Sequence, residues 1–231
     1  MDLPYCVEQD YFIFKAKFNG SIIDYLDIIK QCDKLIFSNY NNLKSITGEI
    51  KNKEYFYRSV LFSRFNQPLL NSLEELTNLK RLTFGICFNQ PLANSLDKLI
   101  NLTCLTFGCE FNQPLNDTLY YLNKLEDLTL GFRFNQELNL PSNIKILALS
   151  HNNQNLIDNL PNSIEQIKFG NGFNLSLDNL PNSIKKIRFG KNSKYTNFLN
   201  NLPKSLEQLE LPRNYKLEIK NIPPNCKIIY L

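Results

Sequence analysis

The chain has 231 residues and a formal net charge of +4, with 38 Leu, 33 Asn and 17 Phe but one His and no Trp. A hydrophobic fraction of 43% can bury a core, which argues against disorder, and no apolar run is long enough for a transmembrane helix. The charge is too small to predict a nucleic-acid partner, and a single His without a glycine-rich loop disfavours most catalytic classes.

A repeat extends from about Gln9 to the last residue. Its pattern is L-x-x-L-x-F-G-x-x-F-N, as in Leu79–Asn89. The fourth and sixth positions are apolar in every copy, and residues two apart lie on one face of a β-strand. One copy buries too little apolar surface to offset its loss of backbone entropy, so the copies must stack. The sixth position is filled, in order, by Phe14, Phe37, Phe62, Phe84, Phe107, Leu130, Leu149, Phe169, Phe189, Leu211 and Leu231.

We therefore expect eleven units, each giving one short parallel strand, in a single solenoid domain of residues 9–231. Residues 1–8 precede the first unit, and we interpret them as an N-terminal cap because the ends of a solenoid need covering. The cap would cover Ile13, Ile36 and Leu61 at the fifth position of the first units. Alternatively, these three residues form an apolar docking patch.

Each predicted strand is followed by a second aromatic position, the tenth, and then in most units by Asn. Stacked Asn side chains can bond backbone groups of their own turn and of the next turn. We expect such a column where the strands end and the chain turns inward. The Asn residues are Asn19, Asn41, Asn66, Asn89, Asn112, Asn135 and Asn174.

The segments on the outer side of the units have two forms. Units at 60–130 continue as P-L-x-x-S-L-x-x-L-x-N, and this apolar spacing predicts a short helix or 3₁₀ turn. Units at 144–223 are shorter and carry Leu-Pro or Ile-Pro, which disfavours a helix and favours an extended return. We therefore expect helical or 3₁₀ outer turns in the first half and extended outer turns in the second.

These motifs carry a family resemblance. The Phe-Asn-Gln-Pro-Leu segments and Leu180–Gly190 resemble FNIP repeats, a leucine-rich-repeat subtype abundant in cellular slime moulds and in giant viruses that infect amoebae. The resemblance implies a leucine-rich-repeat horseshoe with about eleven short parallel strands on its concave face, serving as a protein-interaction surface. FNIP repeats of giant viruses are often joined to an F-box, which implies a ubiquitin-ligase substrate adaptor. Only eight residues precede the first unit, so we expect no F-box in this sequence.

The third and fifth positions are expected to face outward on the concave sheet. Along the chain the fifth position is first apolar, then Thr, then basic. The threonines could form a contact strip or could simply favour an exposed strand. The basic residues could bind an acidic partner or phosphate, or could be neutralised by Glu165, Glu207 and Glu210. The candidate partner-binding residues are Arg81, Thr83, Thr106, Asp127, Thr129, Lys168, Lys186, Arg188 and Glu210.

Two further positions have regular occupants. The second position alternates in charge over six successive units, which predicts a ladder of cross-strand ion pairs. Its residues are Glu126, Lys145, Glu165, Lys185, Glu207 and Lys227. The seventh position is often Gly, which we expect to leave bare backbone at the rim of the concave face. These glycines are Gly85, Gly108, Gly131, Gly170 and Gly190.

The sequence suggests no catalytic or metal-binding constellation. His151 falls in a turn with no second ligand at metal-binding spacing. Cys104 has no neighbouring His to activate it, and a disulfide between Cys87 and Cys109 is conceivable but disfavoured in a reducing compartment. The first residues lack an apolar signal segment, so we expect a cytoplasmic protein, in the host cytoplasm if viral. We expect no enzymatic activity, no cofactor and no metal.

The last predicted strand, Cys226–Leu231, has an open edge, and an open edge favours pairing. We therefore expect a homodimer through this edge, unless Pro223-Pro224 turns the segment into a cap. The predicted function is a non-catalytic protein-protein interaction module that uses the concave sheet, with a host protein as one partner. The alternatives are phosphate or nucleic-acid binding by the basic strip, or an adaptor role like that of F-box-linked relatives. We expect no membrane association.

Overall fold

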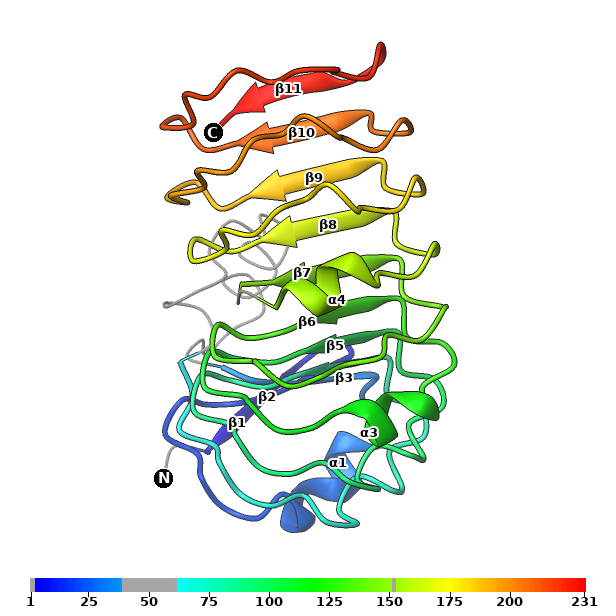
Figure 1. Ribbon diagram of the computed structural model, residues 1–231. Helices are drawn as coiled ribbons and strands as arrows, with labels where there is room; N and C mark the ends of the chain where they lie inside the picture. The colour runs from blue at the N-terminus through cyan, green and yellow to red at the C-terminus, as the bar shows by residue number, and fades with distance from the viewer. Residues whose placement is uncertain (1–2, 39–61, 151–152) are drawn as a thin grey trace.

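The computed structural model describes residues 3–38, 62–150 and 153–231. In these ranges the chain coils into a solenoid, and each turn adds a strand beside the previous one (Figure 1). The strands form one eleven-stranded sheet whose order follows the sequence. They are β1 (Tyr5–Glu8), β2 (Tyr11–Phe14), β3 (Lys34–Phe37), β4 (Arg81–Thr83), β5 (Cys104–Thr106), β6 (Asp127–Thr129), β7 (Ile146–Leu149), β8 (Gln166–Phe169), β9 (Lys186–Phe189), β10 (Gln208–Leu211) and β11 (Lys227–Tyr230).

The core contains two columns of stacked aromatic rings. Within a unit, the rings at the sixth and tenth positions stack, as Phe84 and Phe88 do with 3.9 Å between centroids. Between units, the centroids of Phe84 and Phe107 lie 5.5 Å apart, and those of Phe88 and Phe111 lie 6.0 Å apart. Parallel rings at such distances add to the free energy gained by burial. The predicted core positions are thus buried here, and the Phe excess belongs to the core.

The sheet does not contain the predicted unit around Phe62. Strand β3 pairs directly with β4, so Leu35 lies opposite Leu82. The side chain of Phe62 is 43% exposed, whereas the other Phe residues of its predicted column are buried. Val60 and Leu61, assigned to the same unit, lie outside the described residues.

Phe65 instead completes the unit that begins with β3. Its ring stacks on that of Phe37 with 4.0 Å between centroids. Phe65 follows Phe37 by 28 residues, whereas Phe18 follows Phe14 by four. The unit therefore carries an insertion of 24 residues, and the described chain forms ten units rather than eleven. Ten of the eleven strands, β2 to β11, belong to these units. The remaining strand, β1, precedes the first unit and is antiparallel to β2.

The register of β11 differs by one residue from the prediction. Ile228, not Ile229, lies opposite Leu209, and Tyr230 lies opposite Leu211. Lys227 consequently pairs with Gln208 at the third position and leaves the predicted charge ladder. The cause is a unit one residue shorter between the proline turn and the strand.

The outer turns follow the predicted division with one exception. The 3₁₀ helix η1 (Ile23–Tyr25), α1 (Leu26–Ile29) and α3 (Asn116–Tyr120) lie in the first half, but α4 (Gln154–Asp158) lies in the second. The side chain of Asn153 accepts a hydrogen bond from the Leu156 amide and caps α4 at its start. No helix in the described ranges is long and apolar enough to cross a membrane.

Strand β1 forms the amino-terminal edge of the sheet. It pairs with β2, and Cys6 lies opposite Ile13. Ile13 and Ile36 are fully buried at the fifth position, with Cys6 and Tyr11 packed against them. They therefore do not offer an apolar docking patch.

Candidate functional site

The predicted partner-binding residues share one face of the sheet. The register places Thr83, Thr106 and Thr129 in one row across β4, β5 and β6. The same row continues through Ala148 of β7 to the charged residues of β8, β9 and β10. There Lys168 lies opposite Arg188, which lies opposite Glu210. The strands thus bring together one continuous row from residues far apart in the sequence.

The threonine part of this row offers little surface. Thr83 is 3% exposed and Thr129 is 6% exposed, while Thr106 is half-buried. In the neighbouring row, the guanidinium of Arg81 donates a hydrogen bond to the sulfur of Cys104 at 2.7 Å. A predicted contact strip of hydroxyl groups is therefore inaccessible at two of its three members.

The basic part surrounds a buried carboxylate. Lys186 Nζ lies 2.7 Å from Glu210 Oε1, and Arg188 Nε lies 3.2 Å from Glu210 Oε2. Gln208 donates a further hydrogen bond to Oε1 at 2.7 Å. The side chain of Glu210 is only 7% exposed. Both oxygens of the Glu210 carboxylate therefore accept contacts from cations. This geometry favours the interpretation that Lys186 and Arg188 are neutralised within the chain over the interpretation that they bind an acidic partner or phosphate.

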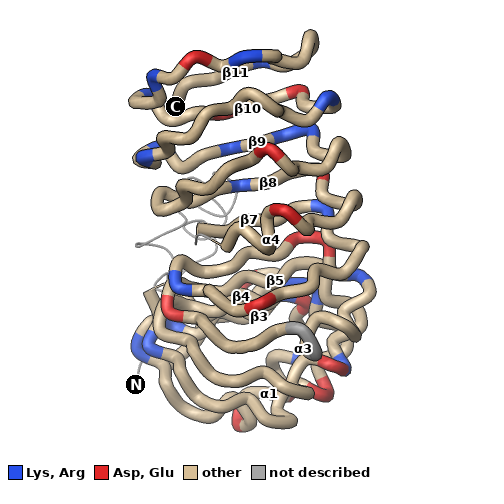
Figure 2. The backbone as a smooth tube through the Cα atoms, viewed as in Figure 1, with Lys and Arg blue, Asp and Glu red and all other residues tan. Residues whose placement is uncertain are grey.

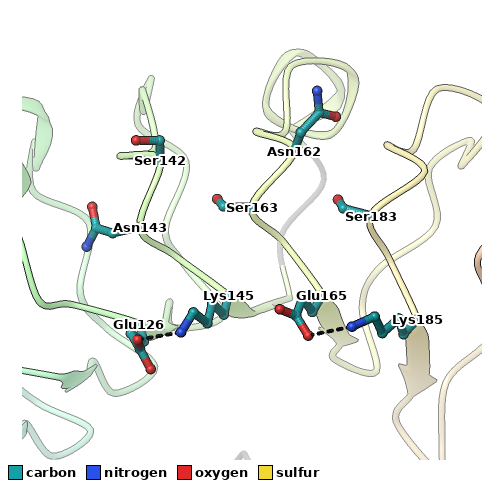
Figure 3. A pocket seen from close by; sticks show the side chains of 9 residues that line it. All are labelled: Glu126, Ser142, Asn143, Lys145, Asn162, Ser163, Glu165, Ser183 and Lys185. Carbon is teal, nitrogen blue, oxygen red and sulfur yellow. Dashed lines mark hydrogen bonds and ion pairs between the residues drawn. The ribbon is translucent and has the colours of Figure 1, made fainter.

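The charge ladder at the second position forms in part and lines a surface pocket. Glu126 pairs with Lys145 at 2.6 Å, and Glu165 pairs with Lys185 at 3.1 Å (Figure 3). The hydrogen bond from Lys145 to Glu126 raises the pKa of the ammonium. These four side chains lie along one wall of a pocket of about 380 Å³.

Serine and asparagine side chains form the opposite side of this pocket (Figure 3). Ser183 Oγ donates to the Ile164 carbonyl at 2.8 Å, whereas the buried Ser163 Oγ has no hydrogen-bond partner among the residues that the structure describes. Because its charged groups pair with one another, the pocket presents no net charge to a ligand.

The ladder also extends to units where the sequence did not reveal it. Asp33 pairs with Lys80 at 3.0 Å and also contacts Lys34. Burial alone would raise the pKa of Asp33, but hydrogen bonds from both ammonium groups hold that pKa below its ordinary value. The signal was hidden because the supposed unit at Phe62 separated Asp33 from Lys80 in the predicted order.

The described residues contain no group of three or more His, Cys, Asp and Glu side chains that could hold a metal ion. His151 lies outside these residues. The six cysteines, Cys87 and Cys109 among them, are thiols and form no disulfide with one another. Burial raises the pKa of the Cys6, Cys32 and Cys226 thiols, which disfavours the reactive thiolate at these three positions.

Comparison with known proteins agrees with the fold. The sequence matches the FNIP Repeat family over residues 134–172 and 151–192. The crystal structure of CroV588, described as a novel circular LRR protein, is 26% identical with a TM-score of 0.57; the match covers 98% of this chain and 41% of that chain. An internalin (inlF) from Listeria monocytogenes is 13% identical with a TM-score of 0.48, covering 95% of this chain and 74% of that one. No curated protein matches the sequence.

The stacked parallel strands and the columns of buried Leu and Phe define a leucine-rich-repeat solenoid. Within that class, residues 134–192 match the FNIP Repeat family, which is what this part of the chain is similar to. The chain spans 41% of the length of CroV588.

Proposed function

We propose that this chain is a non-catalytic protein-interaction module that binds a partner through the concave sheet between β4 and β10. The observation that supports this most is the register, which aligns charged side chains of both signs along one face of a continuous sheet. Asp127 of β6 and Lys168 of β8 are half-buried members of that face. Leucine-rich-repeat solenoids are common scaffolds for such contacts.

A phosphate or nucleic-acid ligand is less well supported on this face. Lys186 and Arg188 already bind the buried carboxylate of Glu210. A phosphate would have to compete with that carboxylate for the same donors. A protein partner can instead use the polar and charged groups as they stand.

The test is affinity capture from an amoeba lysate with the tagged chain as bait. One variant, Asp127→Lys/Lys168→Glu, exchanges two charges on the concave face without changing net charge. A matched control, Glu74→Lys/Lys98→Glu, exchanges two charges on the outer turns, where Glu74 and Lys98 are exposed. We expect specific partners to be retained by the wild type and the control and lost from the concave variant.

Partners that are lost from the control but kept by the concave variant would place the binding surface elsewhere. An unrelated solenoid protein serves as a second bait. If the wild-type chain retains no protein that this second bait does not also retain, the result would argue against the interaction role itself.

A further inference from the structure

Charge is distributed unevenly along the solenoid. Residues 185–231 carry ten Lys and Arg against three Glu, a net charge of +7. Residues 1–184 carry 16 cationic against 19 acidic side chains, a net charge of −3. The overall charge of +4 conceals this asymmetry, which belongs to the last turns of the stack.

Most of these cations lack an internal partner. Glu165 and Glu210 pair with Lys185, Lys186 and Arg188. The other seven cations have no carboxylate partner among the described residues, and neither Glu207 nor Glu218 forms an ion pair with them. They are Lys191, Lys194, Lys204, Arg213, Lys216, Lys220 and Lys227. In the preceding turns Lys30, Lys34, Lys80, Arg133 and Lys145 contact a carboxylate. Five other cations there have no carboxylate partner among the described residues, but they are spread over several turns: Lys17, Arg64, Arg81, Lys98 and Lys124.

Four of the unpaired cations occupy the turns that follow β9 and β10. We call Lys191, Lys194, Arg213 and Lys216 the basic corner; all four are exposed. Lys191 and Arg213 each lie three residues beyond the register partners Arg188 and Glu210, so they are equivalent positions on adjacent turns. Figure 2 shows Lys and Arg segments at this corner of the solenoid.

Buried tyrosines hold these turns in place. Tyr195 and Tyr215 stack with 6.0 Å between ring centroids. Their hydroxyls donate to the carbonyls of Leu175 and Asn197 at 3.0 Å and 3.1 Å. Burial raises the pKa of Tyr195, so its hydroxyl stays protonated and continues to donate. The basic corner is therefore carried by anchored turns rather than by loose loops.

The arrangement works against the stability of the stack. Adjacent turns are about 4.8 Å apart, and like charges at equivalent positions repel. Elsewhere the same solenoid alternates the sign of its charges, as at Glu165 and Lys185. Repelling cations without internal partners are expected where an external anion compensates them.

We infer that the basic corner binds a run of Asp and Glu residues in a partner protein. This surface is distinct from the concave face and can work with or without it. Duplex nucleic acid fits less well, because proteins that bind it commonly make about 6–10 phosphate contacts, more than this corner of four cations provides. An acidic segment of a few carboxylates matches the number of cations and requires no wider basic surface.

The inference can be tested by fluorescence polarisation with a short labelled peptide in which Glu alternates with Gly. Wild-type protein should bind it at low ionic strength, and binding should weaken as salt approaches physiological levels. The variant Lys191→Glu/Arg213→Glu should bind at least roughly tenfold more weakly. The control Lys17→Glu/Lys98→Glu removes two exposed cations from the other half and changes net charge equally; its affinity should change less than about twofold.

Three outcomes would overturn the inference: no binding of the peptide by wild type, equal weakening in both variants, or tighter binding of a single-stranded oligonucleotide than of the peptide. Circular dichroism on each variant verifies the fold. The concave variant Asp127→Lys/Lys168→Glu should bind the peptide like wild type, so failure of the concave proposal and failure of this one are separable.

Discussion

Glycine at the seventh position allows the backbones of adjacent turns to touch. A Cβ atom at Gly108 would overlap the carbonyl group of Gly85, and a Cβ at Gly131 would overlap the Gly108 carbonyl oxygen. The obstructing atoms are backbone, which cannot move aside as a flexible side chain can. The glycines expected to leave a bare rim are, at these two positions, required by close packing between turns.

Substitution of one such glycine should therefore destabilise the chain. We expect Gly108→Ala to lower the free energy of unfolding by about 1–3 kcal/mol, the usual range for overpacking. The matched control is Gly20→Ala, because a Cβ there would meet only the Phe18 ring at ordinary contact distance. Urea denaturation of both variants measures the difference, and equal midpoints would show that the stack relaxes around the added methyl group.

At the scale of single residues, the sequence predicts accurately which core side chains are buried. It predicts burial less accurately for side chains outside the core. Alternation within a strand places Leu82 and Leu105 inward, and both are fully buried. The same alternation places Thr83 on the other face without saying what covers that face, and only the structure shows that it is 3% exposed. The apolar spacing of Val60–Phe62 predicts a strand with Phe62 in the core, whereas the side chain of Phe62 is 43% exposed.

At the scale of the repeated element, asparagine connects successive turns. The Asn89 amide donates to the side-chain oxygen of Asn66 at 2.8 Å, and the Asn112 amide donates to that of Asn89 at 2.9 Å. The column extends from Asn19 to Asn135 and passes directly from Asn19 to Asn66. The stacked arrangement predicted for these residues is confirmed in the first half, while Asn41 lies outside the described residues.

Removing one member should leave a backbone donor without its partner. Asn89 Oδ1 also accepts a hydrogen bond from the Gln113 side chain at 3.1 Å. The substitution Asn89→Ala therefore leaves both the Asn112 amide and the Gln113 side chain without this acceptor. We expect a loss of about 0.5–1.5 kcal/mol, the usual net contribution of a hydrogen bond, because these groups are only part-buried. Asn89→Asp keeps an acceptor oxygen and should lose less. Thermal unfolding of the two variants decides, and an aspartate as damaging as alanine would contradict the hydrogen-bond explanation.

At the scale of the whole molecule, the 24-residue insertion leaves the backbone hydrogen bonds on either side of it in sequence. The Ser38 amide donates to the Phe14 carbonyl, and the Arg64 amide donates to the Ala16 carbonyl. Because those acceptors are two residues apart, Ser38 and Ser63 occupy consecutive places in the solenoid. The ladder thus continues across the gap as if residues 39–62 were absent.

We therefore predict that deleting residues 39–62 preserves the solenoid. The midpoint of thermal unfolding, followed by circular dichroism, should shift by less than about 5 °C, because the deletion joins positions that are already neighbours. Deletion of residues 93–116 is a control of the same length. It exceeds the local repeat of 23 residues by one, so it should shift the apolar columns out of register and unfold the chain. A deletion of 39–62 as damaging as the control would refute the prediction.

At the scale of the whole molecule, the sequence predicted the solenoid, its parallel sheet and its two kinds of outer turn. It missed features that depend on which turns are neighbours, such as the Asp33–Lys80 pair and the register of Lys227. The excess of positive charge in residues 185–231 can be read from the sequence alone. The sequence could not predict that the cations of the basic corner have no carboxylate partner among the described residues, because pairing depends on distances between side chains.

The order of the sheet also determines how the molecule responds to mechanical force. Strands β1 and β11 form its two edges, and each strand bonds only to its sequence neighbours. A pull on the two ends would therefore load one strand pair at a time, and the turns would detach singly. Each detached turn of roughly 20 residues would lengthen the chain by roughly 70 Å. The protein would yield in a series of small steps, and an edge that lost a turn could recover it without refolding the rest.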